Sequence, residues 1–241
     1  MVAAGNPVGA QSEDQEQAAR YANCMDLIEL DADQALEQAQ TWADLGGGDP
    51  ASHCAAVALL RLGHHAAAGE ELESLAASLE QGFAFLQIPI LIQAGQAWFL
   101  AEDLDRAYAI QTTALAREPN NVDLLVDRSM TAATVGDFDG AVSDLSRAQA
   151  NAPQRADILV LRASAYRYLD QAARALADVE RALAMDPGNA EGYLERGNLR
   201  RLAGDDDGAR NDWVEAASRA PDSATAAAAQ ANLAKLDVKV E

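Results

Sequence analysis

Apolar residues recur at helical spacing from an early point in the chain. The segment 33–45 is a clear case, because its apolar residues return every three or four positions, as one face of a helix requires. They are Ala35, Leu36, Ala39 and Trp42. Asp31 can cap this helix, and three consecutive glycines at 46–48 can end it. The same alternation of apolar faces and breaks continues to the C-terminus and predicts an all-α chain.

The pattern predicts the bounds of the individual helices. The ranges are 13–30, 33–45, 50–62, 65–80, 89–101, 104–117, 122–135, 138–151, 156–169, 172–185, 190–203, 206–219 and 223–236. Pro50 and Pro89 are each expected in a first helical turn, where the missing N–H of proline is not needed.

A longer period of 34 residues organises these helices. Four prolines mark it, namely Pro119, Pro153, Pro187 and Pro221. Alanines keep the same spacing in two columns, at 107, 141, 175 and 209 and at 114, 148, 182 and 216. Gly95 and Gly197 share a third column, and Gly136 and Gly204 share a fourth. Self-similarity at a fixed period predicts stacked helix hairpins, and columns of small residues predict close approaches between helices.

These columns resemble the tetratricopeptide repeat, a helix–turn–helix unit of the same length. The resemblance covers residues 88–223 well and 16–82 more loosely. It implies an all-α, right-handed superhelical solenoid of about six repeats with a C-terminal capping helix, and no domain boundary inside the array. The predicted segments are a disordered leader 1–12, two degenerate repeats 13–82, an insertion 83–87, four regular repeats 88–221, a capping helix 222–236 and a tail 237–241.

The insertion at 83–87 shifts the register by five residues and is unusually apolar. Phe83 and Phe85 either fold back or prolong a helix, or they form an exposed docking patch. We favour the first interpretation, because large exposed apolar patches are uncommon in soluble monomers.

Charge narrows the classes of partner. The net charge is −20 and the sequence pI is about 4.3, which disfavours binding to nucleic acid or to an anionic membrane surface. The chain has no run of 18 apolar residues, so no membrane insertion is expected. The acidity is interpreted mainly as a solvated helical surface, with a preference for basic partners as the alternative.

Two alternatives for the cellular compartment remain open. Val8-Gly9-Ala10 has the small-residue form of a signal-peptidase site without the apolar core that precedes one. The chain therefore begins either near a mature N-terminus, in the periplasm, or with a flexible leader, in the cytoplasm. Cys24 and Cys54 lie on first helices of adjacent repeats. They are predicted to form a disulfide if the protein is exported, or to be two buried thiols otherwise.

An arginine column and an aspartate column repeat together, 16 residues apart. In a helix hairpin this offset can bring the two side chains level. The predicted ion pairs are Arg128–Asp144, Arg162–Asp178 and Arg196–Asp212. The repeat that begins at Ile88 has Ala94 and Ile110 in these positions, so both partners are absent together.

No catalytic or metal-binding constellation stands out. His53-Cys54 and His64-His65 lack the second close-spaced ligand pair of a structural zinc site. Neither a Gly-x-Ser-x-Gly motif nor a phosphate-binding glycine loop is present. We therefore expect no enzyme activity, no metal and no cofactor.

The resemblance implies that the first helices of the repeats line a concave groove for another protein or peptide. The groove residues are expected to be Gln93, Gln96, Phe99, Asp123, Asp127, Met130, Thr134, Asp157, Ser164, Arg167, Tyr168, Glu191, Glu195, Asn198 and Arg201. Five are acidic, which favours a basic or mixed-charge segment. Some members of the family grip a C-terminal carboxylate with Lys, Arg and Asn, but of the corresponding residues here only Asn198 fits.

Three functional hypotheses follow. The chain is an interaction scaffold, in a bacterial envelope for example, or a self-associating structural solenoid, or an accessory subunit of an enzyme. The composition, rich in Ala and Arg and poor in Lys, is compatible with the first.

Overall fold

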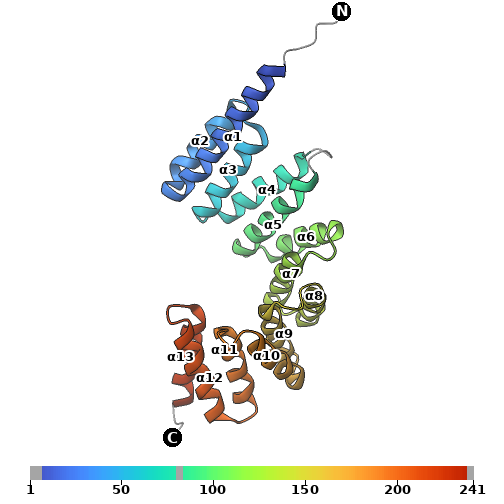
Figure 1. Cartoon of the computed structure of the whole chain (residues 1–241), viewed down its shortest axis with the longest axis vertical. Helices are drawn as coiled ribbons and strands as arrows, with labels where there is room; N and C mark the ends of the chain where they lie inside the picture. Colours follow the sequence, from blue (N-terminus) through green and yellow to red (C-terminus); the bar gives the residue numbers. More distant parts are fainter. Residues whose placement is uncertain (1–6, 80–83, 238–241) are drawn as a thin grey trace, which may run out of the picture. The chain divides into compact units, whose positions relative to one another are not determined.

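The computed structural model describes residues 7–79 and 84–237, and within these ranges every regular element is an α-helix (Figure 1). The helices are α1 (Pro7–Leu30), α2 (Ala32–Asp44), α3 (Gly48–Arg61), α4 (His65–Ser78), α5 (Ala84–Leu100), α6 (Leu104–Arg117), α7 (Val122–Thr134), α8 (Phe138–Asn151), α9 (Ala156–Tyr168), α10 (Ala172–Met185), α11 (Ala190–Leu202), α12 (Asp206–Arg219) and α13 (Ala224–Asp237).

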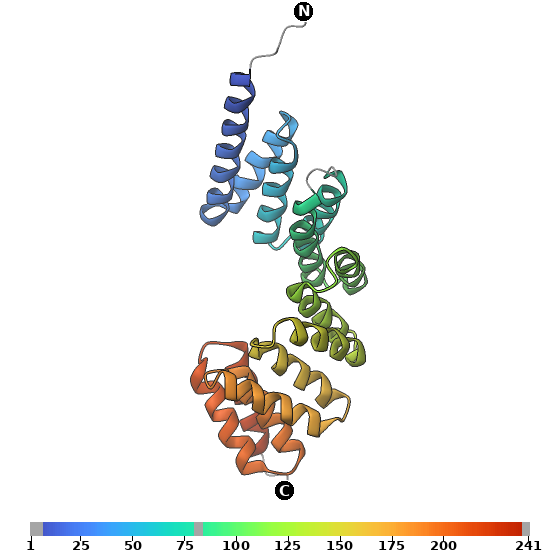
Figure 2. The same ribbon diagram turned by 45° about the vertical axis from the view of Figure 1, so that its right-hand side comes forward.

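The helices form two compact units, residues 1–119 with α1–α6 and residues 120–241 with α7–α13. Within each unit every odd-numbered helix packs against the even-numbered helix that follows it, and each hairpin packs on the next (Figure 2). The last helix, α13, packs on α11 and α12, as a capping helix does. The 34-residue period runs through Pro119 and gives no sign of a division there.

Two predicted helix starts, those of α1 and α5, differ from the observed ones by five residues or more, and every other predicted helix end lies within two residues of the observed one. Helix α1 begins at Pro7 inside the expected leader, because proline suits a first helical position. Ala84–Gln87 of the expected insertion belong to α5, so Pro89 lies inside a helix rather than in its first turn. Residue 237, expected in the tail, is the last residue of α13. Residues 1–6, Phe83 and 238–241 lie outside the described part of the chain.

The side chain of Gln87 accounts for the longer α5. Its Nε2 donates to the carbonyl oxygen of Ala76 at 2.7 Å, and its Oε1 accepts from Arg117 Nη1 at 2.7 Å. These two bonds tie the start of α5 to α4 and α6. Pro89 lacks an N–H and removes one helical hydrogen bond, and the bonds of Gln87 offset this loss.

The turn between the two helices of a hairpin has a positive φ in one column. Gly63, Gly136 and Gly204 have φ of 78°, 84° and 83°. Glu102 and Asp170 occupy the same place with φ of 61° and 56°. Glycine reaches this conformation without steric cost, so two of the five turns carry strain.

Glycine is required at 197 for packing. A Cβ there would lie 2.6 Å from Cδ1 of Trp213 on α12, whereas a Cβ at Gly95 would lie 3.1 Å from Cγ of Gln111 on α6. The small column expected to mark close approaches therefore faces the partner helix of the hairpin.

A bidentate ion pair joins the two helices of each hairpin in the second unit, at the places where the 16-residue offset predicts it. The pairs are Arg128–Asp144, Arg162–Asp178 and Arg196–Asp212. In the middle pair, Nε of Arg162 lies 2.7 Å from Oδ2 of Asp178, and Nη2 lies 2.8 Å from Oδ1. The two side chains are 16% and 12% exposed. The hydrogen bond with Asp178 raises the pKa of the Arg162 guanidinium.

Candidate functional site

The first helices of all three hairpins in the first unit share a pocket of about 620 Å³, which we call the α1/α3/α5 pocket. Its walls are mostly apolar, and the end of α4 closes one side. The lining residues are Gln17, Ala18, Tyr21, Asp49, Pro50, His53, Leu75, Leu79, Leu86, Pro89, Ile90 and Gln93. This volume is typical of ligand-binding clefts.

A line of hydrogen bonds crosses this pocket and joins α1, α3 and α5. The hydroxyl of Tyr21 lies 2.7 Å from Nδ1 of His53, and Nε2 of His53 lies 2.9 Å from Oε1 of Gln93. The amide oxygen of Gln93 can only accept, so Nε2 carries a proton. Nδ1 faces the Tyr21 hydroxyl, which can donate to it. Burial raises the pKa of Tyr21 further above neutral pH, so this hydroxyl stays protonated as its unperturbed pKa already requires.

Of these three residues only Gln93 was expected on a binding face, whereas Tyr21 and His53 were not. Gln93 follows His53 by 40 residues, close to one repeat plus the five-residue shift of register. The period therefore indicates that His53 lies within one residue of the position equivalent to Gln93, although His53 was considered only as a metal ligand. Tyr21 lies in the degenerate first repeat, where the columns give no register.

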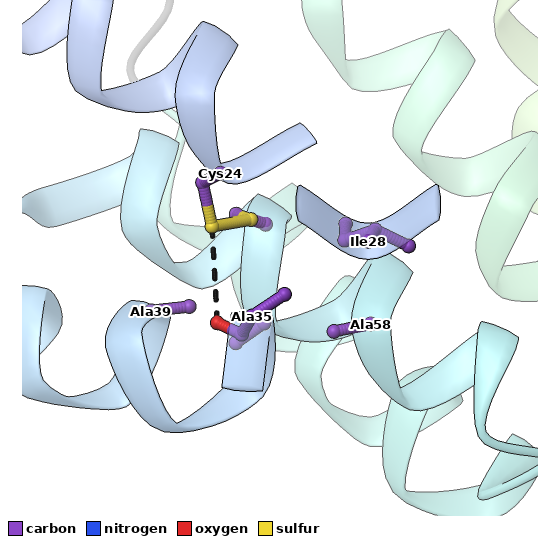
Figure 3. Close-up of a cluster of buried hydrophobic side chains, with 7 residues drawn as sticks. Cys24, Ile28, Ala35, Ala39 and Ala58 are labelled. Carbon is purple, nitrogen blue, oxygen red and sulfur yellow. Dashed lines mark hydrogen bonds between the residues drawn. A yellow bond between two sulfur atoms is a disulfide. The ribbon is translucent and has the colours of Figure 1, made fainter. Parts of the chain in front are cut away.

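A disulfide joins the same two helices as the Tyr21–His53 bond. The structure joins Cys24 of α1 to Cys54 of α3, with their Cα atoms 6.3 Å apart. Tyr21 precedes Cys24 by about one turn, and His53 is the neighbour of Cys54. Figure 3 shows the sulfur–sulfur bond among Ile28, Ala35, Ala39 and Ala58. Sγ of Cys24 lies 3.9 Å from the carbonyl oxygen of Ala35, a contact and not a hydrogen bond, because a disulfide sulfur carries no proton.

The second unit has a smaller pocket of about 310 Å³ between α7, α8 and α9, which we call the α7/α9 pocket. Four expected groove residues line it, namely Met130, Thr134, Ser164 and Tyr168. Met130 is 42% exposed and Tyr168 is 58% exposed. The ring of Tyr168 stacks on Phe138, with the centroids 4.5 Å apart, so a surface aromatic pair borders the pocket.

Arg155 holds two of the acidic residues expected in the groove. Its Nη1 donates to Asp123 at 2.7 Å, and its Nη2 donates to Asp157 at 2.5 Å. The hydrogen bond from Arg155 lowers the pKa of the Asp157 carboxyl, and both carboxylates raise the pKa of the guanidinium. Arg155 was not among the expected groove residues.

A second arginine, Arg167, binds the buried Glu195 across α9 and α11. Nε lies 2.6 Å from Oε1 of Glu195, and Nη2 lies 3.2 Å from Oε2. Burial raises the pKa of the Glu195 carboxyl in spite of Arg167, and Glu195 raises the pKa of Arg167 against the effect of its own burial. We assign a charged pair at neutral pH, because the guanidinium and carboxylate meet in bidentate geometry.

The other expected groove residues are spread over several environments. Oδ1 of Asn198 accepts from Trp213 and from Asn232 of α13, and Arg201 pairs with Asp206 at 2.8 Å. Gln96 and Glu191 are exposed, and Phe99 and Asp127 are half-buried. Asp123, Asp157 and Glu195 thus meet arginine, and the face is of mixed charge rather than simply acidic.

The described residues form neither a metal site nor a membrane-spanning helix. Across 7–79 and 84–237, no three His, Cys, Asp or Glu side chains come close enough to share a metal ion. None of the helices in these ranges has the length and apolarity that crossing a membrane requires.

Comparison with known proteins places the fold. No family model and no curated protein matches the chain. The C-terminal part of a TPR repeat-containing protein from Cytophaga hutchinsonii superposes with a TM-score of 0.67 at 14% identity, over 90% of this chain and 95% of that one.

Two further structures are similar. TTC0263, a thermophilic TPR protein of Thermus thermophilus, gives a TM-score of 0.61 at 20% identity over 78% and 98% of the two chains. MamA residues 41 to the end, from Desulfovibrio magneticus, gives 0.61 at 20% identity over 77% and 97%. The chain has the tetratricopeptide-repeat fold.

Proposed function

We propose that this protein is a non-catalytic scaffold that binds a segment of another protein along the first helices of its hairpins. The α1/α3/α5 pocket carries the proposal. Three first helices line it, with apolar side chains such as Leu86 and Ile90 of α5, and Leu75 of α4 closes one side around the polar line from Tyr21 to Gln93. An open apolar cleft with a few placed polar groups is the usual form of a binding site.

The exposed apolar and charged residues of the second unit favour a basic or mixed-charge segment as the ligand. Met130 and Tyr168 offer the polarizable and aromatic surface that is enriched at protein interfaces. The neighbouring residues carry both signs of charge, with Arg155 between Asp123 and Asp157. A segment with an apolar anchor between charged residues would match this face.

Selection of random peptides displayed on phage against the full chain tests the proposal. Selected peptides should lose at least about tenfold in affinity with Tyr168→Ala or with Gln93→Ala, as removal of an anchoring contact does. The matched control is Val214→Ala on the second helix α12, where a large apolar side chain is also 52% exposed.

Three results would count against the scaffold. They are failure to select any peptide, equal losses with Val214→Ala, and assembly of the chain alone that grows with concentration in light scattering. The last result would support the self-associating solenoid instead.

We also propose that the protein works in an oxidising compartment such as the periplasm. The Cys24–Cys54 bond supports this location, since disulfides persist there and are rare in a reducing cytosol. Thiol alkylation of the protein in its native cells, followed by mass measurement, tests it. Two alkylated cysteines would contradict the location.

A further inference from the structure

We propose that the Cys24–Cys54 disulfide controls the α1/α3/α5 pocket. In the oxidised chain the bond keeps α1 seated on α3. Its reduction releases α1 and removes one wall of the pocket. The consequence for partner binding rests on the proposed function, whereas the release of α1 does not.

Helix α1 buries little of itself against the rest of the unit. Among its described side chains, at 15–30, only Cys24 and Ile28 are buried. Helix α7, by comparison, buries six side chains in thirteen residues. Since burial of apolar surface is the main source of stability, α1 is weakly held by packing alone.

The core beneath α1 is made of small residues. Around the disulfide it consists of Ala35, Ala39, Ala55 and Ala58, with Ile28 as its one large buried side chain. The larger side chains that pack against this core are only partly buried, namely Met25, Leu27, Leu36 and Val57. Each alanine buries less apolar area than a leucine would. Two half-buried hydrogen bonds also hold α1, from Trp42 to Gln17 and between Tyr21 and His53. The covalent bond therefore supplies much of the attachment.

The same helix supplies one wall of the pocket. Gln17, Ala18 and Tyr21 of α1 all line it. The Tyr21–His53 bond spans the two helices that the disulfide joins, within one turn of it. Departure of α1 would open the pocket on that side and leave His53 bonded to Gln93 alone.

One of the two cysteines borders a hollow at the surface. Cys24 lines a hollow of about 520 Å³ between α1 and α2, together with Arg20, Glu37 and Trp42. Cys24 is 5% exposed, whereas Cys54 is 0% exposed. A thiolate that enters this hollow therefore approaches Cys24 rather than Cys54.

The redox step is ordinary thiol–disulfide exchange with a dithiol as the reductant. One thiolate of the dithiol attacks Sγ of Cys24, the Cys24–Cys54 bond breaks, and Cys54 leaves as a thiolate that takes up a proton. The second thiolate of the dithiol then attacks the dithiol sulfur of the mixed disulfide. Cys24 leaves as a thiolate and is protonated. The dithiol loses two electrons and becomes a disulfide, and the protein gains two thiols.

Amide hydrogen exchange of the full chain, with and without dithiothreitol, tests the release of α1. Protection of the amides in 15–30 should fall by roughly 30-fold or more, in line with the contribution of a disulfide that closes a loop of this length. Amides of α4 and α5, and of α9 and α10 in the second unit, should keep their protection. The Cys24→Ala/Cys54→Ala chain should resemble the reduced protein and should not respond to dithiothreitol.

Two outcomes would overturn the inference. If α1 keeps its protection in the reduced chain, packing alone holds it. If α1–α6 all lose protection together, the bond stabilises the whole unit and controls no single wall. Peptides that depend on Gln93 should bind only the oxidised chain, while peptides that depend on Tyr168 bind both forms. Absence of Gln93-dependent peptides would contradict the proposed function of the pocket without altering the exchange result.

Discussion

At the scale of single residues, the Arg–Asp pairs set the alignment of the two helices in each hairpin of the second unit. Each pair removes two opposite charges from water, and mutual attraction and hydrogen bonds offset that cost only while both partners are present. Arg162 and Asp178 meet in two nearly equal contacts of 2.7 and 2.8 Å. Such a pair discriminates against a shifted hairpin, because a shift would leave both charges unpartnered.

Arg162→Ala should therefore destabilise the second unit by about 3 kcal/mol, since it leaves Asp178 buried without its partner. Adding Asp178→Ala should cost less than the sum of the two single losses, by about 1 kcal/mol or more. Urea unfolding followed by circular dichroism measures all three variants. Arg174→Ala, at an exposed arginine of α10, is the matched control, with an effect within about 0.5 kcal/mol. Simple addition of the single losses would show that the two side chains do not interact.

A second prediction at this scale concerns the small-residue column. Gly197→Ala should cost about 1–3 kcal/mol, because the added methyl group overlaps the Trp213 ring and forces it to move. Gly95→Ala should cost much less, because the flexible Gln111 can yield and alanine favours the helix by about 1 kcal/mol. Thermal unfolding of the two variants gives the comparison. Equal losses would mean that the aromatic contact does not require glycine.

At the scale of the helix and its turns, the sequence predicts the elements well for a clear physical reason. Helix bounds depend on local periodicity, caps and breakers, and Asp103, Asp137 and Asp205 do cap their helices. The predicted start of α5, at residue 89, lies too far along the chain because Pro89 was placed in a first helical turn, where proline is common. What moves that start to Ala84 is the hydrogen bonding of Gln87 to α4 and α6, a tertiary effect that no local pattern contains.

The turn column supplies a prediction at this scale. Glu102→Gly should stabilise the chain by about 0.5–1 kcal/mol, since relief of the left-handed conformation outweighs the added freedom of the unfolded glycine. Asp170→Gly should gain less, because aspartate tolerates this conformation better than glutamate. The reverse change, Gly136→Ala, should cost about 1 kcal/mol. Urea unfolding ranks the three, and a loss of stability in Glu102→Gly would contradict the interpretation.

At the scale of the whole molecule, the period predicted hairpins in series but not the two compact units or the α1/α3/α5 pocket. A repeat pattern states which residues occupy equivalent places. It does not state which side chains meet across three helices when the register shifts by five residues between them. Tyr21, His53 and Gln93 are brought together by the packing of α1, α3 and α5, so the pocket emerges only from the folded unit.

Reduction of the disulfide should lower the free energy that holds α1 on α2 and α3 by about 2–4 kcal/mol, because the released helix regains the freedom that the cross-link removes. Labelling with 5-fluorotryptophan reports on three separate places, since Trp42 lies on α2 and bonds to Gln17 of α1, Trp98 lies on α5, and Trp213 lies in the second unit. The Trp42 resonance should shift to lower urea on reduction. The Trp98 and Trp213 resonances are the internal controls, and an equal shift in either would contradict a local effect.

The position of the Arg–Asp pairs also bears on how such a chain can change in evolution. Each pair closes within one hairpin, between residues 16 apart. Arg162 also donates to Ser146 of the preceding hairpin, but its carboxylate partner lies in its own hairpin. An in-frame duplication or deletion of one 34-residue segment therefore adds or removes the arginine and the aspartate together and leaves neither charge without its partner. A contact that reaches across hairpins, such as that of Arg155 with Asp123, would be lost whenever such an event separates the two hairpins. Internal pairing allows the number of hairpins to grow or shrink by recombination while every surviving hairpin keeps its own alignment.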